Sequence, residues 1–149
     1  MKKISILLTF LFLFSCANNN FNKDFLQFEL RLVDSDQNEP STEMMLYGSQ
    51  EKFFVHDSVY LNNEHIVKTE LINWQSHPQV LVSLNEIGRG AFAQFTANNI
   101  GQKAAILVDN KLVSAPRINA GINSGQLIIV GLLNHEEAMS ISNGILPQK

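Results

Sequence analysis

Short stretches of alternating hydrophobic and polar residues predict the first strands of this chain. In residues 26–33, leucine and phenylalanine alternate with mostly polar neighbours, a period of two that is typical of a strand with one face in water. Residues 80–84 predict another strand, and residues 52–55 form a short candidate. The pattern of residues 66–74 is ambiguous. Residues 34–43 are polar and contain a proline, which indicates a loop.

Two continuous apolar stretches predict strands inside the domain. Residues 104–108 are entirely apolar, which suits a central strand covered on both sides, and residues 127–130 predict a second buried strand. Asp109 and Asn110 follow the first stretch directly, and both residue types tolerate positive φ. We therefore expect a tight turn there that leads into a strand at 111–114.

A helix is predicted over residues 86–100. Asn85 is a suitable N-cap for it, and Gly101 supplies the C-terminal stop. The spacing i, i+4, i+8 places three apolar residues on one helical face. This expected inner face consists of Ile87, Ala91 and Phe95, with Phe92 beside them.

The last helix begins at Asn134, and Glu137 completes a capping-box-like pair with it. Its expected inner stripe is Ala138, Ile141 and Ile145. Strands and helices are mixed along the chain with at least one hairpin. This order predicts the α+β class, with two main helices packed on a mixed or antiparallel sheet.

The N-terminus has the order of a secretory signal. Lys2 and Lys3 give a positive start, residues 4–14 are almost wholly apolar, and a serine precedes Cys16. This apolar run is too short to cross a bilayer, which needs about 20 residues. Its Leu-x-Ser-Cys end resembles the lipobox of bacterial lipoproteins. We therefore predict that residues 1–15 are a lipoprotein signal peptide and that Cys16 carries a lipid.

Beyond the signal, residues 16–24 read as a polar lipidated tether and residues 25–149 as a single domain. Processing removes two of the 11 basic residues and none of the 14 acidic ones, so nine oppose 14 and the formal net charge becomes −5. An acidic exterior argues against nucleic acid and against anionic lipid as partners. The lipid on Cys16 is therefore the expected membrane contact.

The expected location is the cell envelope, on the extracytoplasmic side of a bacterial membrane. Ala17 and Asn18 follow the lipid-bearing cysteine. They lack the aspartate that retains lipoproteins in the inner membrane of some bacteria. This favours the outer membrane if the cell has one.

Metal-binding patterns are incomplete. Residues 34–45 open like a calcium loop, but Glu39 stands in place of the glycine at the sixth position and Met45 in place of the glutamate at the twelfth. A solvated loop is the better interpretation. Zinc is also disfavoured, because the histidines share no ligand spacing. These are His56, His65, His77 and His135.

Catalytic patterns are incomplete as well. Gly88 and Gly90 flank an arginine without the third glycine of a phosphate loop. Ser124 does not lie in a nucleophile elbow, and Ser114 before Ala-Pro is explained by turn chemistry. We therefore expect neither an enzyme nor a cofactor.

Aromatic residues offer one binding hypothesis. The phenylalanines of the pattern are expected in the core. Any that are exposed would form the floor of a peptide-binding cleft. They are Phe53, Phe54, Phe92 and Phe95.

Six features of residues 80–146 follow one another in a recognisable order. A strand end runs into Leu-Asn-x-x-Gly-x-x-x-Phe, and a helix stop, a strand, a hairpin strand that ends in Ser-Ala-Pro, a glycine-flanked strand and an acidic helix start follow. The segments are Leu84 to Phe92, Asn99 to Gly101, Ala105 to Asp109, Lys111 to Pro116, Gly125 to Gly131 and His135 to Ala138. In this order they resemble the periplasmic head domain of the protein-translocase subunit SecD. Residues 28–33 are similar to the strand that leads into that head.

The resemblance implies a head-like α+β fold that contacts exported polypeptides or the secretion machinery. SecD also carries a periplasmic base and membrane helices, and couples a proton gradient to export. This chain shows no such helices after the signal, so a motor role is not expected. The expected function is a membrane-tethered, non-catalytic envelope binding module. The alternative is a structural or regulatory lipoprotein with one dedicated envelope partner.

Overall fold

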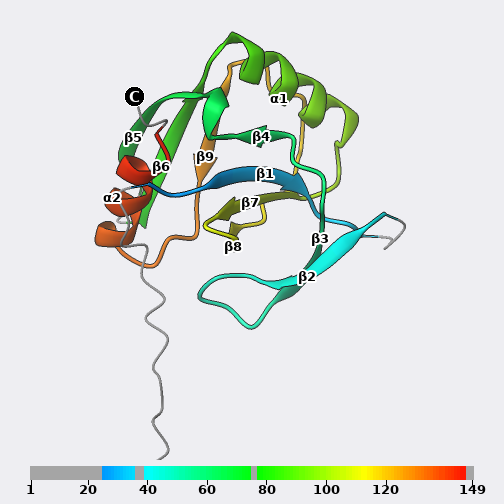
Figure 1. Ribbon diagram of the computed structural model, residues 1–149, viewed down its shortest axis with the longest axis horizontal. Helices are drawn as coiled ribbons and strands as arrows, with labels where there is room; N and C mark the ends of the chain where they lie inside the picture. The colour runs from blue at the N-terminus through cyan, green and yellow to red at the C-terminus, as the bar shows by residue number, and fades with distance from the viewer. Residues whose placement is uncertain (1–24, 36–38, 75–76, 147–149) are drawn as a thin grey trace, which may run out of the picture.

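A computed structural model describes residues 25–35, 39–74 and 77–146. The predicted signal peptide, Cys16 and the tether lie outside these ranges. The described elements and their order are shown in Figure 1. They are β1 (Phe28–Leu32), β2 (Ser41–Met45), β3 (Lys52–His56), β4 (Leu61–Asn62), the short 3-10 helix η1 (Asn63–His65), β5 (Ile66–Trp74), β6 (His77–Leu84), α1 (Glu86–Asn98), β7 (Ala104–Val108), β8 (Lys111–Ser114), β9 (Gln126–Ile129) and α2 (His135–Gly144).

The described strands form three sheets whose ladders are all antiparallel. A four-stranded sheet has the order β4-β1-β7-β8, a three-stranded sheet has the order β5-β6-β9, and β2 pairs only with β3 to form a ribbon. The α+β class with two main helices is therefore confirmed. The ambiguous residues 66–74 are β5, a long strand paired along β6.

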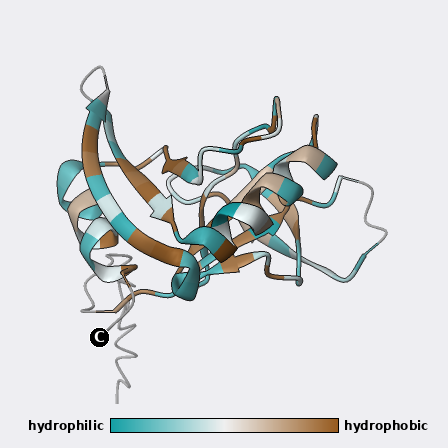
Figure 2. Cartoon of the chain, turned by 90° about the horizontal axis from the view of Figure 1, so that it is seen from above, coloured by the Kyte–Doolittle hydropathy of each residue, from teal (hydrophilic) through white to brown (hydrophobic). Residues whose placement is uncertain are grey.

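The main core lies between the four-stranded and the three-stranded sheets. β1 contributes Phe28 and Leu30, and β6 contributes Val80 and Val82, all at most 1 % exposed. α2 packs on β5 and β6 and closes one side of this core. Its predicted stripe is confirmed, since Ala138, Ile141 and Ile145 are fully buried. Figure 2 shows teal and brown alternating along the long curved strands that enclose the core.

The β2–β3 ribbon covers part of the other face of the four-stranded sheet. A second apolar cluster forms there, and Glu29 and Arg31 of β1 are half-buried on this face. The alternation predicted for β1 is therefore confirmed, but its polar face is only partly exposed to water. The predicted loop 34–43 is also too long, because β2 begins at Ser41. The polar residues of β2 form a strand because they pair with β3 along the whole length of β2.

α1 buries a different face from the predicted one. Asn85 Oδ1 accepts the Gly88 N–H at 2.8 Å, which confirms the N-cap. Ile87, however, is 76 % exposed, while Gly88, Phe92 and Phe95 are buried. A Cβ on Gly88 would lie 2.8 Å from the His65 Cβ. The helix therefore turns its glycine toward η1, and this rotation carries Ile87 into solvent.

The turns and caps around β7 to β9 agree mostly with the sequence. Asp109 and Asn110 have φ of 48° and 59°, which confirms the tight turn between β7 and β8, and all five residues of β7 are buried. β9, by contrast, is buried on only one face. The capping box of α2 is half formed: Asn134 accepts the Glu137 N–H at 2.9 Å. The Glu137 carboxylate accepts instead from the Leu133 N–H and the Tyr47 hydroxyl.

Candidate functional site

An apolar groove of about 520 Å³ opens between the two main sheets, beside β9. Its floor reaches core side chains of both sheets and of α1, and its far wall is the loop that follows β8. Among the described residues that line it, Arg117 alone is charged. The lining consists of Leu30, Leu81, Phe92, Thr96, Ala104, Ile106, Pro116, Arg117, Ile118, Asn119, Ala120, Ile122, Ser124, Gln126, Leu127 and Ile128. Apolar lining with few polar groups is typical of binding pockets.

The far wall of the groove is held by backbone hydrogen bonds. Pro116 O accepts the Ala104 N–H at 2.9 Å, and the Ile118 N–H donates to Gln102 O at 2.8 Å. Farther along, the Ile122 N–H donates to Thr96 Oγ1 at 2.9 Å. The wall is therefore tied both to the start of β7 and to α1, so the groove is a preformed feature of the fold.

The near wall is β9 and the turn that precedes it. Gly125 has a φ of 70°, a conformation that glycine adopts without steric cost. A Cβ there would also lie 3.1–3.3 Å from the aliphatic part of Arg89. The Arg89 side chain continues past this point, and its Nε donates to Asn123 O at 2.9 Å. Arg89 therefore fixes the turn that aims β9 along the groove.

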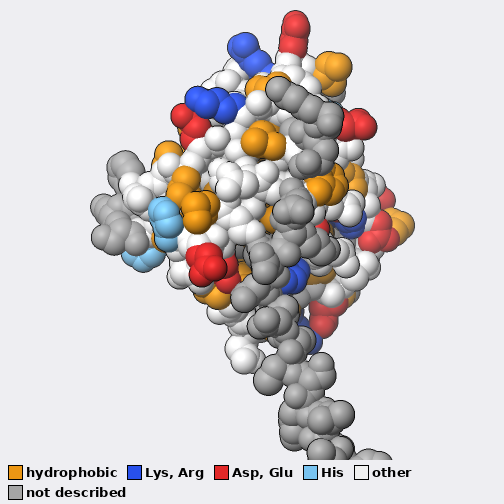
Figure 3. Space-filling view, turned by 60° about the vertical axis from the view of Figure 1, so that its left-hand side comes forward, with side chains coloured by type: hydrophobic (Ala, Val, Ile, Leu, Met, Phe, Trp, Pro, Cys, Tyr) orange, Lys and Arg blue, Asp and Glu red, His pale blue; other side chains and the backbone are white. Residues whose placement is uncertain are grey.

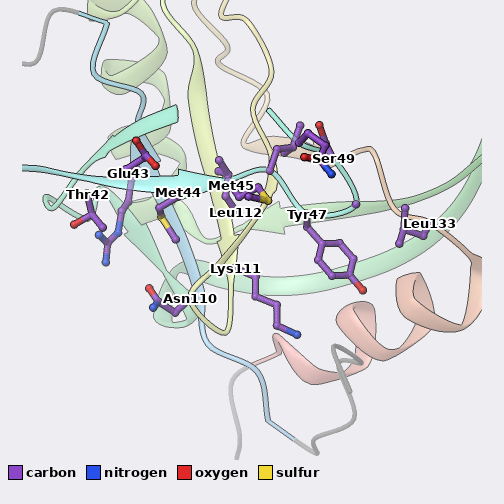
Figure 4. A pocket seen from close by; sticks show the side chains of 14 residues that line it. Thr42, Glu43, Met44, Met45, Tyr47, Ser49, Asn110, Lys111, Leu112 and Leu133 are labelled. Atoms are coloured by element: carbon purple, nitrogen blue, oxygen red, sulfur yellow. The ribbon is translucent and has the colours of Figure 1, made fainter. Parts of the chain in front are cut away.

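A second hollow, of about 910 Å³, lies beside the β2–β3 ribbon (Figure 4). Met44 and Met45 of β2 lie on one side of it, and Asn110 of the β7–β8 turn and Lys111 of β8 lie on the other. Its lining mixes both charges with apolar side chains. It consists of Arg31, Thr42, Glu43, Met44, Met45, Leu46, Tyr47, Gly48, Ser49, Gln50, Asn110, Lys111, Leu112 and Leu133.

Tyr47 joins this second hollow to α2. Its hydroxyl donates to Glu137 Oε1 at 2.7 Å, and the Lys111 ammonium lies 5.7 Å from its ring centroid. The pKa of Tyr47 is raised from 10.0 to about 12. Burial is the largest cause, and the hydrogen bond to Glu137 and the negative charge of that carboxylate add to it. The phenol is therefore neutral at physiological pH and acts as a donor.

The metal candidates are not brought together. Among the described residues, no group of three or more His, Cys, Asp or Glu side chains could hold a metal ion. His65 Nδ1 accepts the Asn62 N–H at 3.1 Å in a local capping box. His56 lies 3.7 Å from the Asp34 carboxylate, while His77 and His135 are exposed on other elements. Asp34, the start of the calcium-like loop, is buried at 7 % exposure and accepts the Glu39 N–H at 3.4 Å.

The other sequence candidates have structural explanations. Ser124 Oγ accepts the Gln126 N–H at 3.3 Å in the turn before β9. Ser114 is buried at the end of β8, and Gly88 and Gly90 both lie inside α1. The proposed lipidation site, Cys16, lies outside the described residues.

The groove itself was not found from the sequence. Phe92 and Phe95 are buried, as expected, yet Phe92 also lines the groove floor. The remaining lining comes from six separate segments. The only signal was the apolar character of positions such as Ile122 and Ile128, which are 38 % and 42 % exposed.

Exposed apolar residues elsewhere are dispersed. Figure 3 shows the side of α2 and β5, where hydrophobic side chains of the described residues lie among charged and polar ones. The two hollows are therefore better candidates for binding than a flat patch. In the described part of the chain, no helix is long and apolar enough to span a membrane.

Known proteins are similar in sequence to part of this chain. SecD protein translocase subunits are similar to it: the one from Rickettsia typhi is 34% identical over 109 residues, which is 69% of this chain and 21% of that protein. The one from Leptotrichia buccalis is 46% identical over 74 residues, 47% of this chain and 18% of that protein. The chain thus spans about a fifth of the length of these relatives.

Solved structures share the fold. A membrane component SecDF that enhances protein export has a TM-score of 0.66 at 22% identity, covering 82% of this chain and 62% of that one. SecDF in a super-membrane-facing form has a TM-score of 0.63 at 21% identity, covering 81% and 19%. The family model of the SecDF P1 head subdomain matches residues 39–145, which is most of the described domain. The chain therefore belongs to the SecDF P1 head family.

Proposed function

We propose that this protein is a membrane-tethered, non-catalytic binding module of the bacterial cell envelope that contacts exported polypeptides. The observation that carries the proposal is the apolar groove beside β9, in a chain of the SecDF P1 head family. The relatives that share the sequence are protein translocase subunits. A head domain with a preformed groove suits transient contact with chains that pass the membrane.

The chemistry of the groove supports a polypeptide ligand rather than a charged metabolite. Its lining carries one charge, on Arg117, and its floor is formed by Leu30, Ile106 and Phe92. A phosphate or carboxylate ligand needs several donors or cations, whereas an unfolded polypeptide offers apolar side chains that bury favourably against such a floor. The groove also presents Asn119 and Gln126, which can hydrogen-bond a peptide backbone.

The distribution of reactive groups supports a non-catalytic role. Catalysis by side chains needs a nucleophile or an acid–base pair within hydrogen-bond reach of one another. In the described ranges, the groove lining holds Thr96 and Ser124 but neither a histidine nor a carboxylate. Thr96 is already engaged with Phe92 O and the Ile122 N–H.

A second candidate function is a structural or regulatory lipoprotein with one dedicated envelope partner. The hollow beside the β2–β3 ribbon favours it, because its lining mixes charged and apolar side chains, a surface that suits a single complementary partner. Exposed Met45 and Leu133 at its border would add apolar contact.

The tether is part of the same proposal. A lipid on Cys16 would hold the domain at the extracytoplasmic surface of a membrane, the outer membrane where the cell has one. The described chain starts beside α2, since the Leu26 N–H donates to Gly144 O at 2.7 Å. Cys16→Ser should abolish lipid processing and release the protein from the membrane fraction. Processing and membrane association equal to those of the unchanged protein would contradict the lipid assignment.

The binding function is tested by photo-crosslinking in the native cells. A photoreactive amino acid replaces Ala120 on the groove wall, or the exposed Glu136 of α2 as the matched control. Capture of many exported proteins, or of the translocase, from position 120 alone supports the proposal. One dominant envelope protein favours the second candidate function. Equal capture from both positions contradicts a role for the groove.

A further inference from the structure

β9 leaves one side of its sheet without a neighbour. In the three-stranded sheet it pairs with β6, and no other strand of the described residues pairs with its outer side. The unpaired backbone groups of such an edge can pair with another chain. The question is which groups β9 presents there.

The hydrogen-bond phase of β9 is fixed by one bond at its start. The Leu84 N–H donates to Gly125 O at 2.9 Å, and the two residues continue the β6–β9 register. In an antiparallel pair, residues bonded to the partner alternate with residues whose backbone groups point away. The backbone N–H and C=O groups of Leu127 and Ile129 therefore bond to β6, and those of Gln126 and Ile128 point away from β6. The Gln126 N–H agrees with this phase, because it donates to Ser124 Oγ rather than to β6.

The groove runs along this outward edge. Successive residues of a strand point to opposite faces, so a cavity on one face would touch every second residue. The groove touches Gln126, Leu127 and Ile128 in a row. It therefore lies beside the backbone of β9, next to the outward N–H and C=O of Ile128.

We infer that the groove binds an extended polypeptide segment as a fourth strand beside β9, paired with the backbone of Ile128. The inference rests on the proposed function and names its binding mode. Every second side chain of the added strand would point between the two sheets, toward Phe92 and Leu127. The expected ligand is therefore a short extended segment with apolar residues at alternate positions and no need for a fixed sequence.

The β2 edge is the obvious competitor, and its chemistry is less suitable. The β2–β3 pairing is bounded by two hydrogen bonds, from the Asp57 N–H to Pro40 O and from the Leu46 N–H to Glu51 O. Counting from these bonds by the same alternation, the backbone groups of Glu43 point away from β3. The hollow along that edge, however, contains Arg31, Glu43 and Lys111. Burying these charges against an apolar segment would be unfavourable.

The test blocks each edge with a proline. Ile128→Pro removes the outward N–H and places the proline ring where an added strand would pair. The hydrogen bonds of β9 to β6 remain, and edge strands tolerate proline at such positions. Ile128→Ala is the matched control, because it removes the same side chain and keeps the N–H. Glu43→Pro blocks the β2 edge in the same way. Thermal unfolding first confirms that all three variants of the full chain fold.

The probe is a fluorescent synthetic peptide of alternating valine and threonine, and the readout is its dissociation constant by anisotropy. We expect Ile128→Pro to weaken binding about tenfold or more relative to Ile128→Ala. Proline removes one backbone hydrogen bond to the peptide, and its ring blocks the position that the peptide backbone would occupy. Glu43→Pro should bind like the unchanged protein. A matching peptide with alternate backbone nitrogens methylated on its pairing edge should also bind at least about tenfold more weakly.

Several results would overturn the inference. Equal binding by Ile128→Pro and Ile128→Ala would place the peptide in the groove without strand pairing, and the proposed function would stand. Loss only in Glu43→Pro would assign the binding to β2. If the peptide did not bind but position 120 still crosslinked to exported proteins, strand addition would be contradicted and the proposed function would stand. Concentration-dependent dimers that Ile128→Pro abolishes would identify a second copy of this chain as the occupant instead.

Discussion

Tyr47 and Glu137, 90 residues apart, are joined by a 2.7 Å hydrogen bond from the phenol to the carboxylate. The bond ties the β2–β3 turn to the first turn of α2. Glu137 is 8 % exposed and has one further donor, the Leu133 N–H at 3.3 Å. Tyr47 therefore supplies one of the hydrogen bonds that the buried carboxylate requires. The same bond holds the ribbon against the rest of the domain.

Tyr47→Phe should destabilise the fold, because it removes this donor and leaves the ring. We expect the free energy of unfolding to fall by about 1.5–3 kcal/mol, the usual cost of losing a hydrogen bond to a charged group. Urea unfolding measures it. Tyr60→Phe is the control. The ring centroids of Tyr60 and Phe95 lie 4.7 Å apart with their planes tilted, and the substitution keeps this contact. Tyr60 is 38 % exposed, so a change within about 0.5 kcal/mol is expected. Equal losses in both variants would contradict the role of the Tyr47 bond.

The same bond should give alkaline sensitivity. The pKa of Tyr47 is raised to about 12 in the folded protein, first by burial and then by Glu137, from 10.0 when exposed. Folding therefore favours the protonated phenol, and this contribution is complete below pH 10 and lost as the pH rises through about 12. The difference in unfolding free energy between the unchanged protein and Tyr47→Phe should shrink over this window. A constant difference from pH 9 to pH 12 would contradict it.

Gly88→Ala and Gly90→Ala should change stability in opposite directions. Both positions lie inside α1, where alanine is favoured over glycine by about 1 kcal/mol. A Cβ on Gly90 would meet nothing within 4 Å, whereas one on Gly88 would meet the His65 Cβ at 2.8 Å and Leu84 Cβ at 3.3 Å. Gly90→Ala should therefore stabilise by about 0.5–1 kcal/mol, and Gly88→Ala should destabilise by about 1–3 kcal/mol. Two stabilising substitutions would show that η1 yields to the helix.

Local chemistry explains which parts of the fold were predictable. Asp109 and Asn110 adopt positive φ at the turn, Asn85 caps α1, and β7 is apolar throughout and buried on both faces. Each of these outcomes depends on a residue and its immediate neighbours, so the sequence pattern was sufficient. The inner stripe of α2 followed for the same reason.

Features that depend on distant segments were not predictable from the pattern. Ile87 fits an apolar stripe, but the approach of His65 to Gly88 sets the rotation of the helix. Ser41–Met45 is polar, yet it pairs with β3 across a turn. The groove exists because hydrogen bonds attach the 116–122 loop to Ala104 of β7 and Thr96 of α1 rather than to β9. No single stretch of the sequence encodes the resulting gap between this loop and β9.

Asn63 should be among the least replaceable polar residues. Its Oδ1 accepts the Phe28 N–H, and its Nδ2 donates to both Leu26 O and Ile145 O, each at 2.8 Å. It thus joins β1 to the end of α2. Asn63→Asp keeps the size, removes both donors and faces a charge toward two carbonyls, so a loss of about 2–4 kcal/mol in unfolding free energy is expected. Asn73→Asp, at an exposed position of β5, serves as the control. A loss under about 1 kcal/mol at position 63 would show that water replaces these bonds.

The last prediction concerns the wall of the groove. Thr96 is 2 % exposed, donates to Phe92 O at 2.9 Å and accepts the Ile122 N–H at 2.9 Å. Thr96→Val keeps the side-chain volume but leaves the Ile122 N–H without its acceptor, at a cost of about 1–3 kcal/mol. Thr96→Ser keeps the hydroxyl and should retain the bond.

Thr96→Val should therefore accelerate amide exchange at Ile122 while exchange in β7 changes only with global stability, because the bond acts on the wall alone. It should also weaken polypeptide binding more than Thr96→Ser does, since a loosened wall must be ordered again when the ligand binds. Hydrogen exchange and peptide anisotropy measure the two effects separately. If exchange at Ile122 accelerated but binding were unchanged, the loop after β8 would be shown not to form part of the binding surface, and β9 alone would remain.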